Sequence, residues 1–257
     1  MKTFQLVSTT FALSSVLALA GCPKDNSAMT AEDYDDVAVA MGSLIANSSG
    51  GEMGSVTDSI ELSQGSGSSL KAVTGVSAHE VIIRAGLTYE YFVDCLDTAG
   101  ATQTACDPAT TNSASIAVNW RGDLAVPRYS ASITRTGEWT LTGLQTAEAE
   151  LNGTGSFDLV SHFEALNRPV TKDLSLSYNA EYSAVKVDLA TKLVTSGSIT
   201  YEIQGSRNVE RPLGNRAGEF SLDAEVTFDG AGNATLVLDT SRSYTINLTT
   251  GAVAQDQ

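Results

Sequence analysis

The fold class of this chain is decided by the stretch Leu174-Ser175-Leu176-Ser177-Tyr178-Asn179-Ala180-Glu181-Tyr182-Ser183-Ala184, in which apolar and polar side chains alternate. Successive side chains of a β-strand point to opposite faces, so a period of two places every apolar residue on one face. Strands of this kind form antiparallel sheets that have one face in the core and the other in water. The run from Phe220 to Phe228 repeats the pattern. We therefore expect a mainly β protein.

Weaker alternation extends this pattern over residues 78–257, and short connectors rich in turn residues separate the segments. Two such connectors are Arg135-Thr136-Gly137-Glu138 and Asp229-Gly230-Ala231-Gly232-Asn233. Connectors of this length join strands that are antiparallel neighbours. The sequence predicts an antiparallel meander of about ten or eleven strands, which include the segments 87–95, 116–120, 129–133, 139–141, 147–151, 157–163, 174–184, 199–203, 220–228, 236–238 and 244–248.

A sheet with this many strands is expected to bend. Open sheets of this size curl or split into two layers. We therefore expect a barrel or half-barrel, with a β-sandwich as the alternative. A membrane-spanning barrel shows the same alternation with its faces inverted, but the short segments and the polar end Ala254-Gln255-Asp256-Gln257 argue against it.

Residues 30–64 show a helical pattern instead. Thr30 and Asp33 have the spacing of a capping box, and further acidic residues follow in the first turn, where the helix dipole is positive. Apolar residues then recur at steps of three and four, which places on one face Tyr34, Val37, Ala38, Met41, Leu44 and Ile45. A weaker pattern follows through Met53, Val56 and Ile60. We expect one or two helices that pack on the β domain, followed by a Gly- and Ser-rich linker at residues 65–77.

The first 21 residues have the layout of a secretory signal peptide, with Lys2 as the sole charge and an apolar core over residues 11–19. This core is far shorter than the roughly 20 residues that a membrane-spanning helix needs. The run Leu19-Ala20-Gly21-Cys22 resembles the lipobox of bacterial lipoproteins. The resemblance implies cleavage before Cys22 and lipidation of its thiol. Residues 22–29 would then be a tether between the lipid and the fold.

The resemblance also implies a location. Each buried CH₂ group of an acyl chain contributes about 0.8 kcal/mol to membrane binding, so two or three chains on Cys22 would anchor the protein firmly. Pro23 follows the cysteine, whereas an Asp there would resemble an inner-membrane retention signal. We expect a lipid-anchored protein of the bacterial cell envelope, at the outer membrane or the cell surface.

The chain has three cysteines, an odd number that is unfavourable in an oxidising compartment. If Cys22 carries lipid, Cys95 and Cys106 remain as a pair that an oxidising periplasm would keep as a disulfide. This bridge would clamp the base of a long hairpin around Asp97–Gly100. A redox centre is the alternative, but the sequence contains no C-x-x-C.

The charge balance excludes some partners. The chain carries 15 basic and 30 acidic residues, a formal net charge of −15, and removal of Lys2 with the leader makes it more negative. Nucleic-acid binding depends on neutralising phosphates with Lys and Arg, so we expect no nucleic-acid partner. The charge instead indicates a soluble, solvated surface.

No catalytic, metal or cofactor motif is recognisable in the sequence. His79 and His162 are the two histidines, and neither has another histidine at ligand spacing. Acidic pairs such as Glu148 with Glu150 lie on the polar side of a strand, whereas acid–base catalysis needs a carboxyl group whose pKa burial has raised. No G-x-S-x-G motif occurs. We expect no enzymatic activity, no metal and no cofactor.

Two functions therefore compete. The first is a non-enzymatic structural or interaction module that binds an envelope protein. The second is a carrier or chaperone for a hydrophobic ligand such as a lipid, because small residues on the apolar side of the strands would leave room inside a curved sheet. These residues are Ala147, Ala149, Ala180, Ala184 and Ala224.

Overall fold

The computed structural model describes residues 29, 31–47, 51–65, 78–84, 87–164, 170–210, 212 and 214–256. Its two helices are α1 (Ala31–Ile45) and α2 (Glu52–Ser63). The strands are β1 (Ala78–Arg84), β2 (Leu87–Leu96), β3 (Ser113–Val126), β4 (Tyr129–Thr142), β5 (Glu148–Glu164), β6 (Thr171–Asp188), β7 (Val194–Glu210), β8 (Arg216–Phe228), β9 (Asn233–Leu238), β10 (Arg242–Asn247) and β11 (Val253–Gln255). Neither described helix is long and apolar enough to span a bilayer.

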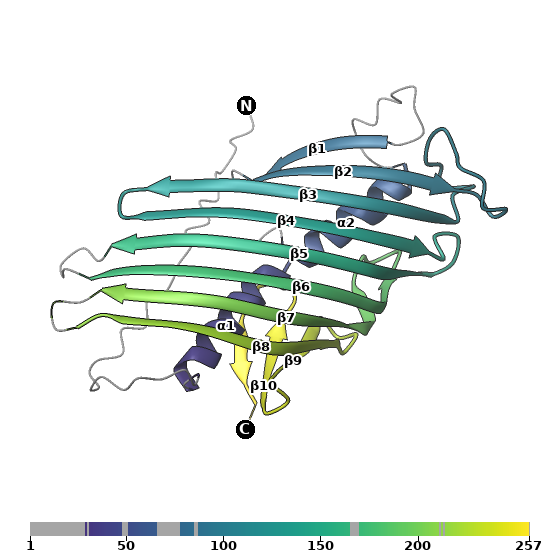
Figure 1. Cartoon of the computed structure of the whole chain (residues 1–257). Helices are drawn as coiled ribbons and strands as arrows, with labels where there is room; N and C mark the ends of the chain where they lie inside the picture. The colour runs from purple at the N-terminus through teal and green to yellow at the C-terminus, as the bar shows by residue number, and fades with distance from the viewer. Residues whose placement is uncertain are drawn as a thin grey trace, which may run out of the picture.

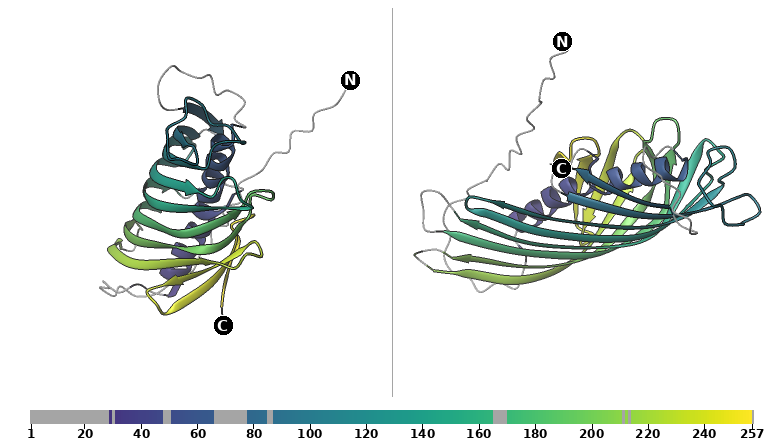
Figure 2. Two further views of the ribbon diagram at one scale, coloured as in Figure 1. Left: turned by 90° about the vertical axis from the view of Figure 1, so that its right-hand side faces the viewer. Right: turned by 90° about the horizontal axis from the view of Figure 1, so that it is seen from above.

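The eleven strands of the described chain form one antiparallel sheet in the order in which they occur in the sequence (Figure 1). The predicted meander with two N-terminal helices is therefore confirmed. The sheet is not closed into a barrel, because β1 and β11 stay at its two edges. A sandwich is also wrong, since every strand pairs within the same sheet. The sheet curves around both helices, which lie on its concave side (Figure 2).

The concave, inner face of the sheet forms one hydrophobic core with the helices. This core contains residues of both helices and of strands β2 to β10. The predicted apolar face of α1 is confirmed, because Val37, Ala38, Met41 and Ile45 are buried. Hydrogen bonds from Tyr34 to Asp239 (2.6 Å) and from Tyr244 to Asp35 (2.8 Å) connect α1 to the C-terminal part of the sheet. The helices thus pack on the concave face of the sheet.

Strand β6 contains the alternating stretch from Leu174 to Ala184, and it follows the predicted pattern as far as Tyr182. Leu176, Tyr178, Ala180 and Tyr182 are buried on the inner face, but Ala184 is exposed. The β6–β7 register shifts after Ser183, which marks a β-bulge, and Ala184 has a φ of 47°. A bulge inserts one extra residue and so reverses the alternation. Val185 and Val187 are buried in its place.

One predicted turn is wrong. Arg135-Thr136-Gly137-Glu138 lies in the middle of β4, so the segments 129–133 and 139–141 belong to a single strand. Gly137 serves packing here, because a Cβ atom at this position would lie 2.9 Å from the Trp139 ring and from the Val118 side chain. The glycine therefore makes room for an indole ring inside the strand.

A pair of similar turns closes two hairpins. The Asp188 side chain accepts hydrogen bonds from the backbone N–H groups of Ala190 and Thr191 between β6 and β7. The Asn247 side chain does the same with Thr249 and Thr250 between β10 and β11. The two segments, Val187-Asp188-Leu189-Ala190-Thr191 and Ile246-Asn247-Leu248-Thr249-Thr250, are similar in sequence because they use the same turn chemistry.

Candidate functional site

Of the predicted site residues, Cys22 lies outside the described residues, as do residues 1–28 around it. Cys95 and Cys106 form the predicted disulfide, with their Cα atoms 5.4 Å apart. The bridge links the end of β2 to the connection between β2 and β3, as expected for a clamp at the base of this hairpin.

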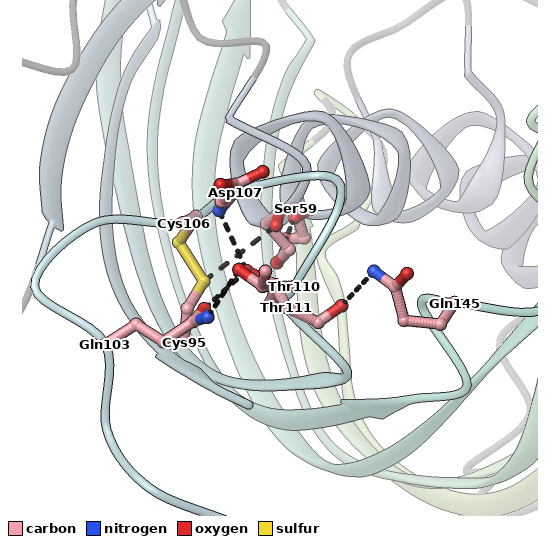
Figure 3. The surroundings of a disulfide bond; sticks show 9 residues. Ser59, Cys95, Gln103, Cys106, Asp107, Thr110, Thr111 and Gln145 are labelled. Atoms are coloured by element: carbon pink, nitrogen blue, oxygen red, sulfur yellow. Dashed lines mark hydrogen bonds between the residues drawn. A yellow bond between two sulfur atoms is a disulfide. The ribbon is translucent and has the colours of Figure 1, made fainter. Parts of the chain in front are cut away.

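The disulfide also packs this connection on the C-terminal end of α2 (Figure 3). Cys95 Sγ lies 3.9 Å from the Ser63 carbonyl oxygen. Gly65, at φ +68°, passes so close to Cys106 that a Cβ atom would lie 2.8 Å from the Cys106 carbonyl oxygen. Gln145 donates to the carbonyl oxygen of Thr111 at 2.7 Å and ties the connection to the next hairpin. The bridge therefore lies beside the C-terminal end of α2 and links the β2–β3 connection to the sheet.

The two histidines lie far apart on the outer face of the sheet. His79 contacts Glu90 at 2.8 Å and stacks on Phe92. His162 contacts Asp173 at 2.6 Å and Glu164 at 3.5 Å, and hydrogen bonds to these carboxylates raise its pKa above the ordinary value of 6.5. Within the described ranges, no three His, Cys, Asp or Glu side chains gather as metal ligands. Neither histidine is thus part of a recognisable metal site in the described chain.

A buried polar centre lies at the opposite end of α2 from the disulfide. Glu52, the first residue of the helix, has no exposed surface. Its carboxylate accepts hydrogen bonds from Tyr178 and Tyr201, each at 2.6 Å. Burial raises the pKa of both tyrosines well above the ordinary value of 10.0, and the Glu52 charge raises it further. Both hydroxyl groups are therefore protonated and donate to the carboxylate.

Arg135 of β4 completes this centre. One guanidinium nitrogen, Nη2, lies 3.3 Å from Glu52 Oε1 and donates to the Tyr182 hydroxyl at 2.8 Å. The centroids of the Trp120 and Trp139 rings lie 5.8 and 5.7 Å from the guanidinium carbon, within the range of cation–π contacts. The Arg135 side chain is 1 % exposed. Arginine stays charged in proteins, so this is a buried ion pair with aromatic neighbours.

The space for this centre comes from a row of small residues across three strands. Gly137, Gly155 and Ala180 are paired partners on β4, β5 and β6. The Trp139 ring lies over Gly137, and the Tyr182 ring lies 3.4 Å from where a Gly155 Cβ atom would be. Because these residues are small, long side chains can turn toward Glu52. Of the alanines expected to leave room, Ala149, Ala180 and Ala224 are on the inner face, whereas Ala147 and Ala184 are exposed.

Several donors in this centre have no hydrogen-bond partner among the described residues. They are Nε and Nη1 of Arg135 and the indole Nε1 of Trp120 and Trp139. All four are N–H groups, so the unsatisfied capacity is for an acceptor. Buried polar groups almost always have a partner. The centre is therefore a set of hydrogen-bond donors that the described part of the chain does not fully use.

Asp58 supplies a second buried carboxylate on α2. Asp58 is 5 % exposed, and the Tyr91 hydroxyl donates to it at 3.0 Å. Burial raises the pKa of Tyr91, and the Asp58 charge raises it further. Glu52 and Asp58 thus give two comparable buried contacts between α2 and the sheet.

The outer face carries an ordered array of carboxylates and hydroxyl groups. Glu138, Thr154, Glu181, Thr200 and Glu225 are successive cross-strand partners from β4 to β8. In the next row, Glu202 lies directly opposite Asp223. We call the carboxylates at 138, 181, 202, 223 and 225 the acidic array. They line a shallow hollow of about 770 Å³, and all five are exposed.

The predicted acidic pair lies on the outer face, where Glu148 is exposed and Glu150 is half-buried. Sequence reasoning missed the buried centre. Arg135 was placed in a turn, although it is in phase with Trp139 and Leu141 on the apolar side of the strand. This shared phase is the signal from which the inward position of Arg135 could have been predicted. No protein-family model, curated protein or solved structure matches the chain.

Proposed function

We propose that this protein is a non-enzymatic, lipid-anchored protein of the bacterial cell envelope, whose β domain is an interaction module. The observation that carries the proposal is that α1 and α2 pack on the inner face of the sheet, whereas the polar side chains of the outer face are exposed among the described residues. The lipobox-like run ending at Cys22 supports the anchor.

The acidic array supports a positively charged protein partner. Like charges placed directly opposite each other, as in Glu202 and Asp223, weaken strand pairing. A partner that brings Lys or Arg side chains into the hollow would relieve this repulsion. Complementary charge also speeds encounter and selects partners. We therefore propose that a basic envelope protein binds over β4 to β8.

In-cell photocross-linking tests this surface. A photoreactive residue replaces Thr200, inside the acidic array, and a matched one replaces Ser115, which is exposed on the outer side of β3. We expect an adduct with one basic protein from position 200 alone. The adduct should disappear with Glu202→Gln and Asp223→Asn and weaken as salt increases. Equal cross-linking from both positions, or an adduct that survives neutralisation, would contradict the proposal.

A carrier for a hydrophobic ligand is the second candidate. The specific observation in its favour is the group of unpartnered N–H donors around Arg135, which lies within the apolar inner face. Such a face with one convergent polar group is typical of small-molecule sites.

A further inference from the structure

The Glu52 carboxylate does not bond all the N–H groups of Arg135 and its neighbours. Its carboxylate contacts one guanidinium nitrogen, Nη2, at 3.3 Å, while Nε and Nη1 have no partner among the described residues. Arginine binds carboxylates best through two parallel hydrogen bonds, because its planar fork matches the two oxygens. A carboxylate that is not held on α2 can therefore satisfy this arginine better than Glu52 does.

An apolar strip extends from Arg135 toward the ends of the strands away from the disulfide. The next inner residue of β4 is Ile133, whose cross-strand partner is Leu159, followed by Leu176. Phe220 continues this row and lies over Gly205. Ile133, Leu159 and Phe220 are half-buried, which distinguishes them from the core around α2. The strip thus continues the carboxylate site with apolar surface that the helices cover in part.

Ile133 lies two residues from Arg135, about 7 Å along β4, and the row from Ile133 to Phe220 then crosses four strand spacings, roughly 19 Å. An extended laurate chain is shorter than this path and fits within it. A ligand with a carboxylate at Arg135 and an alkyl chain on the strip therefore matches both the chemistry and the dimensions of this part of the inner face.

The buried side of α2 is unusually polar, which favours its displacement. Besides Glu52 and Asp58, the helix buries three serines, at positions 55, 59 and 63. The Ser59 and Ser63 hydroxyls donate to carbonyl oxygens of α2 itself, at 2.7 Å. These two bonds stay intact when the helix leaves the sheet. Burial of polar side chains also contributes less free energy than burial of apolar ones.

We propose that Arg135, together with Tyr178, Tyr182 and Tyr201, is the carboxylate-binding site of a fatty-acid ligand. The ligand carboxylate replaces that of Glu52 when the N-terminal end of α2 moves away, and the alkyl chain lies on the strip of Ile133, Leu159 and Phe220. Glu52 is thus an internal competitor of the ligand. This inference rests on the carrier function proposed second, and it names the class of ligand.

Tryptophan fluorescence provides a direct measurement, because both tryptophans of the chain flank Arg135. The full chain with Cys22→Ser is titrated with laurate, so that no acyl group of its own competes. Dodecanol and dodecyltrimethylammonium serve as probes with the same chain and a neutral or positive head group. We expect a saturable change in emission with laurate and none with the other two.

Variants separate the role of Glu52 from general loosening of α2. Glu52→Gln keeps an acceptor for the tyrosines but removes the competing charge, and we expect laurate to bind about tenfold more tightly. Asp58→Asn weakens the other buried contact of α2 and should change laurate affinity less than about twofold. The double variant Glu52→Gln with Arg135→Gln should lose laurate binding. Near-UV circular dichroism checks that each variant is folded.

The outcomes distinguish this site from the carrier function. Binding of all three probes with similar affinity would overturn the carboxylate site while leaving a carrier. No saturable change with any probe would overturn both. Equal gains in Glu52→Gln and Asp58→Asn would show that loosening of the helix suffices, which contradicts competition by Glu52. If Glu52→Gln does not fold, the comparison of laurate with dodecanol in the parent protein decides the question.

Discussion

Glu181 and Tyr182 are neighbours on β6, but they belong to opposite electrostatic environments. Glu181 is exposed in the acidic array, where water screens its charge. Tyr182 points inward and accepts a hydrogen bond from the buried Arg135. The outer face therefore carries many charges, and each of them has only a small effect on stability. Charge on the inner face is restricted to a few groups, each of which depends strongly on its partner.

The largest expected effect follows from breaking the inner ion pair. Glu52→Ala leaves Arg135 buried without its carboxylate, and loss of one member of a buried pair costs about 3–5 kcal/mol of unfolding free energy. Glu202→Ala on the outer face should change stability by less than about 0.5 kcal/mol. Urea unfolding measures both. Equal midpoints for the two variants would contradict the contrast between the faces.

Removal of the disulfide tests how much the contacts at the other end of α2 contribute to stability. Replacing Cys95 and Cys106 by serine opens a loop with a sequence separation of 11. We expect a loss of about 2–3 kcal/mol in the chain-entropy description of cross-links. Thermal unfolding of this variant measures the loss, and the parent protein with reductant should show the same shift. No shift in either sample would exclude a stabilising role for the bridge.

Glycines provide a comparison within the sheet. Gly137→Ala places a methyl group 2.9 Å from the Trp139 ring beside Arg135, so we expect a loss of about 1–3 kcal/mol from overpacking. An added Cβ at Gly218 has no neighbour within 4 Å. Gly218→Ala should therefore be neutral or slightly stabilising, because it restricts the unfolded chain. Urea unfolding compares the two, and a greater loss at Gly218 would contradict this packing.

The smallest effect is expected at His162 on the outer face. Its pKa is raised by Asp173 and Glu164, so the stabilisation is fully present below the ordinary value of 6.5 and is lost as pH rises through the folded-state pKa. Asp173→Asn should lower this pKa, as NMR titration of the ring would show. An unchanged titration in the variant would rule out Asp173 as the cause.

The alternation of apolar and polar residues was sufficient to predict the sheet, because it depends on local geometry. The same holds for α1, whose apolar residues at steps of three and four are those that the core buries. The pairing of Cys95 with Cys106 followed from the odd number of cysteines together with the assignment of Cys22 to lipid. The division of β4 was wrong, because Gly137 resembles a turn residue when its neighbours in space are unknown.

Composition and periodicity, which are local properties, thus determined the antiparallel meander, the two helices and the acidic outer face. Tertiary structure alone decided that the sheet stays open around α1 and α2 and that Glu52 meets Arg135. Glu52 lies 126 residues from Tyr178 and 149 residues from Tyr201 in the sequence. Contacts over such separations depend on how the sheet curves and where the helix crosses it, which no local pattern specifies.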